Sequence, residues 1–169
     1  MNETIYLQLE DGTVYTGFSF GAPLQEDIIS EVVFTTAMTG YLETLTDPSY
    51  YGQMVVQTFP LIGNYGVIPS DFESTHIHLS AYIVKEWCPS PSNFRMQYSL
   101  DEFLKREQIP GIYGLDTRAL TKKIRKTGVM KGLLTSKVPS SSALSDLKKW
   151  SIQDAVSNVT TSSSYTVPS

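Results

Sequence analysis

The chain has 169 residues, 41% of them hydrophobic, which is long enough for one well-buried core with a tail. Its 13 basic and 17 acidic residues give a net charge of −4, which argues against a protein that binds nucleic acid through electrostatics. No apolar run approaches membrane-spanning length, the first residues lack a leader pattern, and the single cysteine favours a reducing cytoplasm.

The first predicted elements form a β-hairpin. Apolar residues alternate over residues 5–9 and again over residues 14–20, and Asp11-Gly12 between them suits a tight turn with positive φ angles. Residues 31–35 and 53–59 hold adjacent apolar side chains, which is typical of strands covered on both faces. Between these two strands, residues 40–45 are predicted to make one helical turn.

Residues 47–50, Asp-Pro-Ser-Tyr, are predicted to form a tight turn that leads into the second of these strands. Pro48 presets its own φ angle and keeps Asp47 out of the helical region. Ser49 is therefore expected at the apex, with its hydroxyl group and its backbone N–H on an exposed rim. From the residues alone, such a turn is more often a plain connection than a binding site.

The second half of the chain alternates between strands and helices. Residues 79–84 are predicted to be a strand, and residues 87–93, with two prolines, a loop. Ser99 and Glu102 have the spacing of a capping box, which predicts a helix that begins there. Residues 109–113 are then predicted to be a short strand.

Asp116 or Thr117 is predicted to cap a second helix, which ends at Gly128. On a helical wheel Thr117, Leu120, Ile124 and Thr127 share one face. The opposite face is basic and consists of Arg118, Lys122, Arg125 and Lys126, with Lys123 on the flank. A face of this kind can dock a partner or an anion, although most are simply solvated.

Residues 129–135 are predicted to be a strand, and residues 141–150 a third helix. The remainder is rich in Ser and Thr, which predicts that residues 151–169 form a linker towards an absent domain. This alternation of elements after an antiparallel hairpin indicates a mixed α+β domain that spans residues 1–150.

Several side chains could carry chemistry, and each has a plainer interpretation. Cys88 is the only thiol, but it lacks a recognisable base or a G-x-C-x-G elbow, so a buried or loop thiol is favoured. His76 and His78 have the spacing of one strand face and could bind a metal ion with Asp71 and Glu73. A closed zinc site would need further ligands, and a solvated or partner-facing histidine pair is favoured.

A plainer structural interpretation is also favoured for three carboxylates and for two glycines. Glu31, Glu43 and Asp47 are carboxylates near one rim, and solvated or capping roles are favoured over a general acid/base pair. Gly63 and Gly66 follow neither glycine pattern of nucleotide-binding loops, so they are interpreted as turn formers.

Several sequence words within residues 31–66 stand in a distinctive order: EVVF, MTGY, LTDPSY followed by GQ, and FPLIGNYG. LEDGT precedes them, and SNFR at residues 92–95 and GLDTRALT at residues 114–121 follow. From about Leu7 to about Thr135 the chain resembles the amino-terminal domain of the small chain of glutamine-dependent carbamoyl phosphate synthase. This resemblance implies a three-layer β/β/α swivelling-type domain with an N-terminal β-hairpin.

In that family the small chain hydrolyses glutamine and passes ammonia to a large synthetase chain. The large chain is a ligase that uses bicarbonate and two ATP, with Mg, to make carbamoyl phosphate for pyrimidine and arginine biosynthesis. The resemblance implies that residues 1–150 dock on the large chain and pack beside a glutaminase domain, which carries the catalytic thiol and is not in this chain. Ser49 is the position whose family counterpart contacts the bound glutamine.

The resemblance therefore implies no catalytic residue, metal site or cofactor in this chain, and a fragment that is inactive by itself and cytoplasmic. Two alternatives stay open from the residues. The first is a stand-alone swivelling domain that binds a small anion or a peptide. The second is a small metalloenzyme built on His76 and His78.

Overall fold

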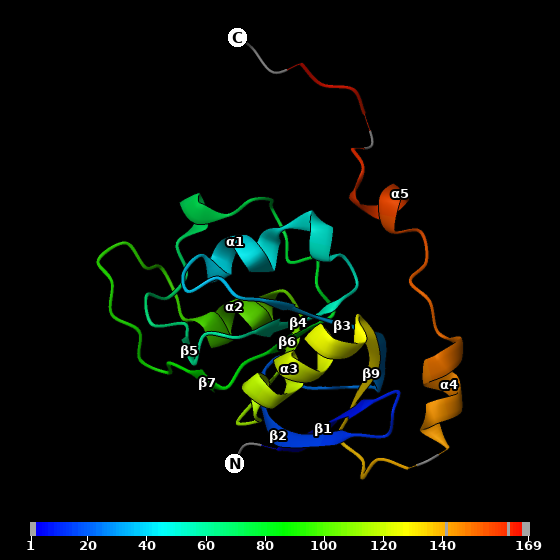
Figure 1. Ribbon diagram of the computed structural model, residues 1–169. Coiled ribbons are helices and arrows are strands. Elements are labelled where there is room, and N and C mark those ends of the chain that lie inside the picture. Colours follow the sequence, from blue (N-terminus) through cyan, green and yellow to red (C-terminus); the bar gives the residue numbers. More distant parts are fainter. Residues whose placement is uncertain (1–2, 141, 162, 167–169) are drawn as a thin grey trace.

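The computed structural model describes residues 3–140, 142–161 and 163–166. Strands and short helices are mixed along the chain (Figure 1), which confirms the predicted α+β class. The strands are β1 (Thr4–Leu9), β2 (Val14–Gly21), β3 (Ile28–Thr35), β4 (Met54–Gln57), β5 (Leu61–Ile62), β6 (Ala81–Ile83), β7 (Glu86–Trp87), β8 (Pro110–Tyr113) and β9 (Met130–Thr135). The helices are α1 (Tyr41–Thr46), α2 (Leu100–Arg106), α3 (Thr117–Thr127), α4 (Ala143–Lys149) and α5 (Ala155–Val159), with 3₁₀ turns η1 (Pro48–Tyr50) and η2 (Pro69–Asp71).

The main sheet of the described residues is a closed barrel with the strand order β1-β2-β8-β6-β4-β3-β9. The neighbouring pairs β3–β4, β4–β6 and β6–β8 are parallel, and the other pairs are antiparallel. This closure differs from the three-layer β/β/α arrangement that the resemblance implies. The reason is that the N-terminal hairpin joins both ends of the sheet, because β1 pairs with β9 and β2 pairs with β8.

The predicted hairpin is confirmed. β1 and β2 pair antiparallel with Leu7 opposite Tyr15. The Leu9 N–H donates to the Thr13 carbonyl at 2.8 Å across the turn, and Gly12 has a φ angle of 87°. A residue without a Cβ adopts such an angle at no steric cost, which is why Asp-Gly marks this turn.

Two clusters of buried apolar side chains lie on opposite faces of the central strands. Because side chains alternate along a strand, Val55 points into one cluster while Met54 and Val56 point into the other. α1 and α2 contribute to the first cluster, and α3 contributes Leu120 and Ile124 to the second. All three of these β4 side chains are fully buried, which confirms that this strand is covered on both faces. Each such side chain contributes about 1.5–3 kcal/mol by leaving water.

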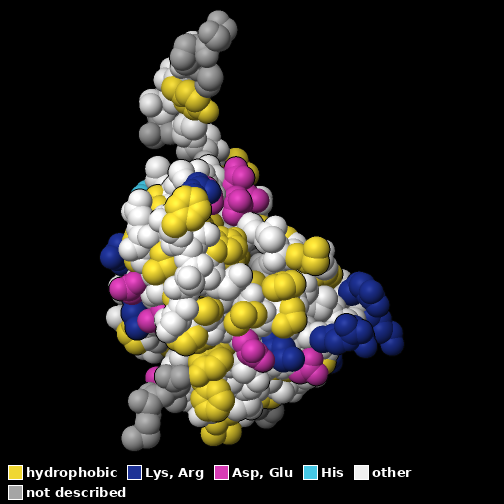
Figure 2. All heavy atoms as spheres, turned by 90° about the vertical axis from the view of Figure 1, so that its left-hand side faces the viewer, with side chains coloured by type: hydrophobic (Ala, Val, Ile, Leu, Met, Phe, Trp, Pro, Cys, Tyr) yellow, Lys and Arg dark blue, Asp and Glu magenta, His cyan; other side chains and the backbone are white. Residues whose placement is uncertain are grey.

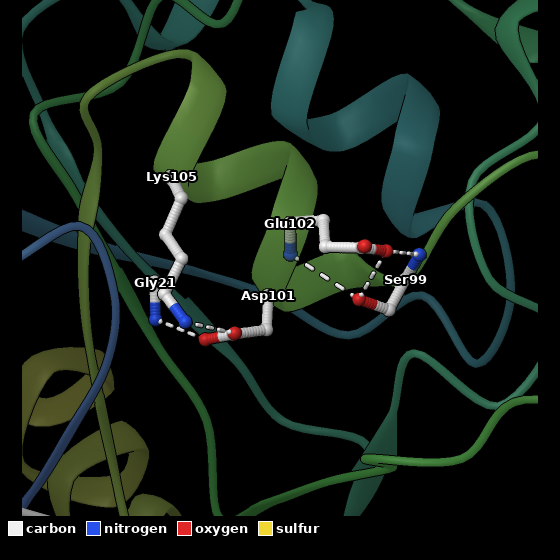
Figure 3. Close-up of polar contacts among 5 residues, drawn as sticks. All are labelled: Gly21, Ser99, Asp101, Glu102 and Lys105. Carbon is white, nitrogen blue, oxygen red and sulfur yellow. Dashed lines mark hydrogen bonds and ion pairs between the residues drawn. The ribbon is translucent and has the colours of Figure 1, made fainter.

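The capping box predicted at the start of α2 is present (Figure 3). The Glu102 N–H donates to the Ser99 hydroxyl at 3.2 Å, and the Ser99 N–H donates to the Glu102 carboxylate at 2.8 Å. Because the Ser99 amide and hydroxyl both donate to this carboxylate, the pKa of Glu102 lies below its usual value. The preceding residue, Asp101, accepts from the Gly21 N–H at 2.7 Å and pairs with Lys105, so it ties α2 to the end of β2.

α3 begins as predicted, because the Asp116 carboxylate accepts from the Ala119 N–H at 2.9 Å. Of the four residues predicted to share one face of α3, Thr117, Leu120 and Ile124 are buried against the barrel, and Thr127 is not. That residue is exposed at the last turn, where its hydroxyl donates to the Lys123 carbonyl.

Lys123 ties α3 to the hairpin, because its ammonium group pairs with Asp11 and donates to the Thr13 hydroxyl at 2.7 Å. Partial burial favours the neutral form of Asp11, but the hydrogen bonds from Lys123 and Thr13 outweigh it and keep the pKa of this carboxyl below its usual value.

Two other predictions need correction or completion. The loop predicted at residues 87–93 begins one residue later, because Trp87 belongs to β7 and the Cys88 N–H donates to the Ile62 carbonyl before the first proline. The predicted linker contains the short helix α5. Residue 141 of the predicted third helix and residues 162 and 167–169 of the predicted linker lie outside the described residues. None of the helices within the described ranges is long and apolar enough to span a bilayer.

Candidate functional site

The Ser49 turn (residues 47–50) connects α1 to β4. Asp47 has an extended backbone, with φ −73° and ψ 116°, as expected before a proline, and its carboxylate accepts from the Ser49 N–H at 2.8 Å. The Tyr50 N–H donates to the Asp47 carbonyl at 3.1 Å. The predicted tight turn is therefore confirmed and takes the form of one 3₁₀ turn.

Ser49 itself is exposed at this turn, as the sequence predicts. Its hydroxyl has no hydrogen-bond partner among the residues that the structure describes. The prediction that its backbone N–H is also presented was wrong, because the Asp47 carboxylate already accepts from that group. One group of Ser49, the hydroxyl, is thus left to contact a ligand.

The backbone that follows the Ser49 turn is held from two sides. The Gly52 N–H donates to the His78 carbonyl at 2.8 Å, and the Ser30 hydroxyl donates to the Gly52 carbonyl. The Gln53 side chain donates to the Glu31 carboxylate at 3.1 Å. These bonds anchor the turn to β3 and to the segment before β6, so the hydroxyl of Ser49 is presented on a fixed support.

The start of α1, on the other side of the turn, is held by Tyr65. The Tyr65 hydroxyl accepts from the Gly40 N–H at 3.1 Å and from the Tyr41 N–H at 3.2 Å. The two tyrosine rings stack with centroids 4.2 Å apart, and the Tyr41 hydroxyl donates to the Gly66 carbonyl. Burial raises the pKa of both hydroxyls above the usual tyrosine value, so they stay protonated in alkaline solution as well as at neutral pH.

We expect Tyr65→Phe to lower the free energy of unfolding by about 1–3 kcal/mol, because two amides at the start of α1 lose their acceptor. Denaturant unfolding followed by circular dichroism measures this loss. Tyr6→Phe is the matched control, because the half-buried Tyr6 makes no hydroxyl hydrogen bond in the described part of the chain. Equal losses in the two variants would contradict the role of Tyr65.

The predicted histidine pair does not lie on a strand. His76 and His78 belong to the irregular segment between η2 and β6, on either side of the buried Ile77. His76 is exposed, and the His78 Nε2 atom lies 2.9 Å from the Ser74 hydroxyl oxygen. Short hydrogen bonds around Ser74, including one to the Thr46 carbonyl at 2.6 Å, hold this segment against α1 instead of a sheet.

The carboxylates proposed with them are engaged elsewhere or exposed. Asp71 pairs with Arg95, with 2.7 Å between the guanidinium nitrogen and the carboxylate oxygen, and Glu73 is exposed. Within residues 3–140, 142–161 and 163–166, no group of three or more His, Cys, Asp or Glu side chains could hold a metal ion.

The remaining candidates also take structural positions. Cys88 is half-buried after β7, and its thiol makes no hydrogen bond to any described residue. Asp47 caps the Ser49 turn, which is one of the roles that the sequence favours, whereas Glu31 accepts from the Gln53 side chain, a contact that was not predicted. Gly63 and Gly66 have φ angles of 87° and 68°, which confirms them as turn formers.

Sequence reasoning missed Tyr65, which lies 16 residues beyond Ser49 and supports the opposite side of the same corner. The available signal was its place in FPLIGNYG, one of the sequence words that carry the family resemblance. The basic face predicted on α3 is confirmed for Arg118, Arg125 and Lys126, which are all exposed, and Lys122 lies on the same face beside them.

Comparisons with known proteins agree with the resemblance seen in the sequence. The family model described as carbamoyl-phosphate synthase small chain, CPSase domain, matches residues 7–134. Proteins named carbamoyl phosphate synthase small chain are 58% identical over 77% of this chain in Fusobacterium nucleatum and 55% identical over 77% in Syntrophotalea carbinolica. One from Bacillus cereus is 49% identical over 96%. The chain spans only 36%, 34% and 44% of the length of these three relatives.

Proposed function

The chain belongs to the carbamoyl-phosphate synthase small-chain family, and from this premise we propose that it is the amino-terminal portion of such a small chain. In this proposal residues 1–150 form a docking domain for the large synthetase chain, and residues 151–169 lead to a glutaminase domain. The whole protein supplies glutamine-derived ammonia for carbamoyl phosphate synthesis from bicarbonate and ATP, a ligase reaction of pyrimidine and arginine biosynthesis. ATP and Mg belong to the large chain. The finer assignment to the three-layer swivelling-type fold follows from the family resemblance; the burial of β4 on both faces fits it and fits the closed barrel equally.

The role of this chain at the glutamine site is carried by one residue, Ser49. The observation that supports it is an exposed hydroxyl without a partner in the described part of the chain, on a turn fixed by Asp47 and Gly52. A hydroxyl can donate to a carbonyl or carboxylate oxygen and can accept from an amide or ammonium group. Held rigidly, it would orient glutamine bound by a neighbouring domain without taking part in bond making.

The docking proposal is tested by mixing this chain with its large synthetase chain and measuring association by size-exclusion chromatography and interferometry. We expect a stable complex, and we expect no release of ammonia from glutamine by this chain alone. Ser49→Ala should form the complex equally well, because its proposed partner is glutamine and not the large chain. Failure of the wild-type chain to associate, or glutamine hydrolysis by the chain alone, would contradict the proposal.

A further inference from the structure

A groove of about 370 Å³ lies beside α3. The Ser49 turn precedes β4, whereas Thr58 of the groove follows it, so the two lie at opposite ends of this strand. Its walls come from the segments that directly follow β3, β4 and β6, which contribute Thr36, Thr58 and Lys85. The fourth wall is α3, the helix that follows β8. Since β3, β4, β6 and β8 are consecutive parallel neighbours, the groove lies at the carboxyl ends of four parallel strands. In α/β proteins this end of a sheet is where loops most often build ligand sites.

The groove is strongly basic. It is lined by Lys85, Arg118, Lys122 and Arg125 and by no acidic residue, although the whole chain has a net charge of −4. None of these four cations forms an ion pair with another described residue. Figure 2 shows Lys and Arg side chains gathered at the right-hand edge of the molecule. This edge corresponds to the front of the view in Figure 1, where α3 lies.

Like charges four residues apart on a helix repel each other, as do Arg118 and Lys122 here. The helix does not need all of its cations for its own packing: Lys123 pairs with Asp11, whereas Lys126 is exposed and lies outside the groove. Lys123 therefore has a structural ion pair and Lys126 is solvated. The other cations of α3 converge on the groove and have no carboxylate partner among the described residues. An anion in the groove would relieve the repulsion of that set.

Hydroxyl groups accompany the charges. Thr36, Thr58 and Thr121 line the groove, and the Thr121 hydroxyl is buried without a hydrogen-bond partner in the described residues. Asp116, the carboxylate that directly precedes α3 in the sequence, caps this helix and does not line the groove. Hydroxyl, guanidinium and ammonium donors in combination are the groups that proteins use to bind phosphate oxygens.

We propose that this groove binds a small oligophosphate, such as pyrophosphate, triphosphate or the phosphate groups of a nucleotide. Four cations need several negative charges, and the span from Arg118 to Arg125 is about 10 Å along the helix, which exceeds one phosphate group. The groove volume is within the range of small-molecule sites. This binding site is separate from the proposed glutamine contact at Ser49 and does not depend on it.

The test is a titration of the ¹⁵N-labelled chain with inorganic tripolyphosphate, pyrophosphate and orthophosphate at constant ionic strength of about 150 mM. We expect saturable binding of tripolyphosphate and pyrophosphate, weaker binding of orthophosphate, and amide shifts concentrated in α3 and around Thr58 and Lys85. Arg118→Glu and Lys122→Glu should each weaken tripolyphosphate binding by about tenfold or more. Lys126→Glu changes the charge of the same helix equally, outside the groove, and should change the affinity by less than about twofold because salt screens it.

Three outcomes would overturn the proposal. They are no saturable binding of tripolyphosphate, an equal loss in Lys126→Glu and Lys122→Glu, or orthophosphate that binds as tightly as tripolyphosphate. Binding of a hexaglutamate peptide at the same amides, with no binding of tripolyphosphate, would overturn it in favour of an acidic protein segment. Thermal unfolding of each variant, followed by circular dichroism, shows whether a variant that binds more weakly is still folded.

Discussion

Ser49→Ala in a full-length small chain should lower glutamine-dependent carbamoyl phosphate synthesis by about three- to tenfold in kcat/KM and leave ammonia-dependent synthesis unchanged. The size follows from one hydrogen bond between substrate and protein, worth about 0.5–1.5 kcal/mol. Ammonia bypasses glutamine, so a residue that only orients glutamine has no effect on that reaction. Both rates are measured on the complex of small and large chains.

The matched control for this substitution is Ser136→Ala, at another exposed serine without a hydrogen bond in the described part of the chain. It should change neither activity. If Ser49→Ala lowers both activities equally, the turn acts in folding or docking. If it lowers neither, Ser49 makes no energetically important contact with glutamine.

Gly21→Ala should destabilise the domain by roughly 2–5 kcal/mol, the largest effect that we expect of any substitution discussed here. Gly21 has a φ angle of 71°, which costs an alanine about 1–2 kcal/mol. An added Cβ would also lie 2.8 Å from both the Ile109 carbonyl oxygen and the Leu104 Cβ atom. The same strain disturbs the Gly21 N–H, which donates to Asp101 at the start of α2 (Figure 3).

Gly12→Ala separates the cost of the positive φ angle from the cost of the steric contacts of the added Cβ. Gly12 also has a positive φ angle, of 87°, but its added Cβ would meet nothing closer than the Leu144 Cδ1 atom at 3.9 Å. That variant should lose only the backbone contribution of about 1–2 kcal/mol. Denaturant unfolding of both variants measures the difference, and a Gly21→Ala variant no less stable than Gly12→Ala would show that α2 and β8 accommodate the extra methyl group.

The elements predicted correctly from the sequence are those decided by residues a few positions apart. The Asp11-Gly12 turn, the capping box of Ser99 and Glu102, and the Asp116 cap each depend on a side chain and a backbone group within three residues. The turn at Ser49 is of the same kind. Local stereochemistry decides these features, so the amino-acid order is sufficient to predict them.

The features that could not be predicted depend on contacts between distant segments. The closure of the sheet requires the hairpin to reach both β8 and β9, and nothing within the hairpin indicates those partners. The support of α1 by Tyr65 and the convergence of Lys85 with Arg118 also depend on contacts between segments that are distant in the sequence. The engaged N–H of Ser49 was missed although its cause is local: the Asp47 carboxylate accepts from the amide two residues later, as the Asp11 carboxylate does, and the turn was predicted from Pro48 without this bond.

The closed pairing of β1 with β9 also limits how this domain can meet other proteins. A strand whose backbone is paired on both sides has no free N–H and C=O row, so another chain cannot extend this barrel by strand addition. The barrel is for the same reason protected from the edge-to-edge association that leads open sheets to aggregate. Recognition at the barrel therefore depends on side chains and loop groups, and substitutions there can change a partner's affinity without disturbing the sheet beneath.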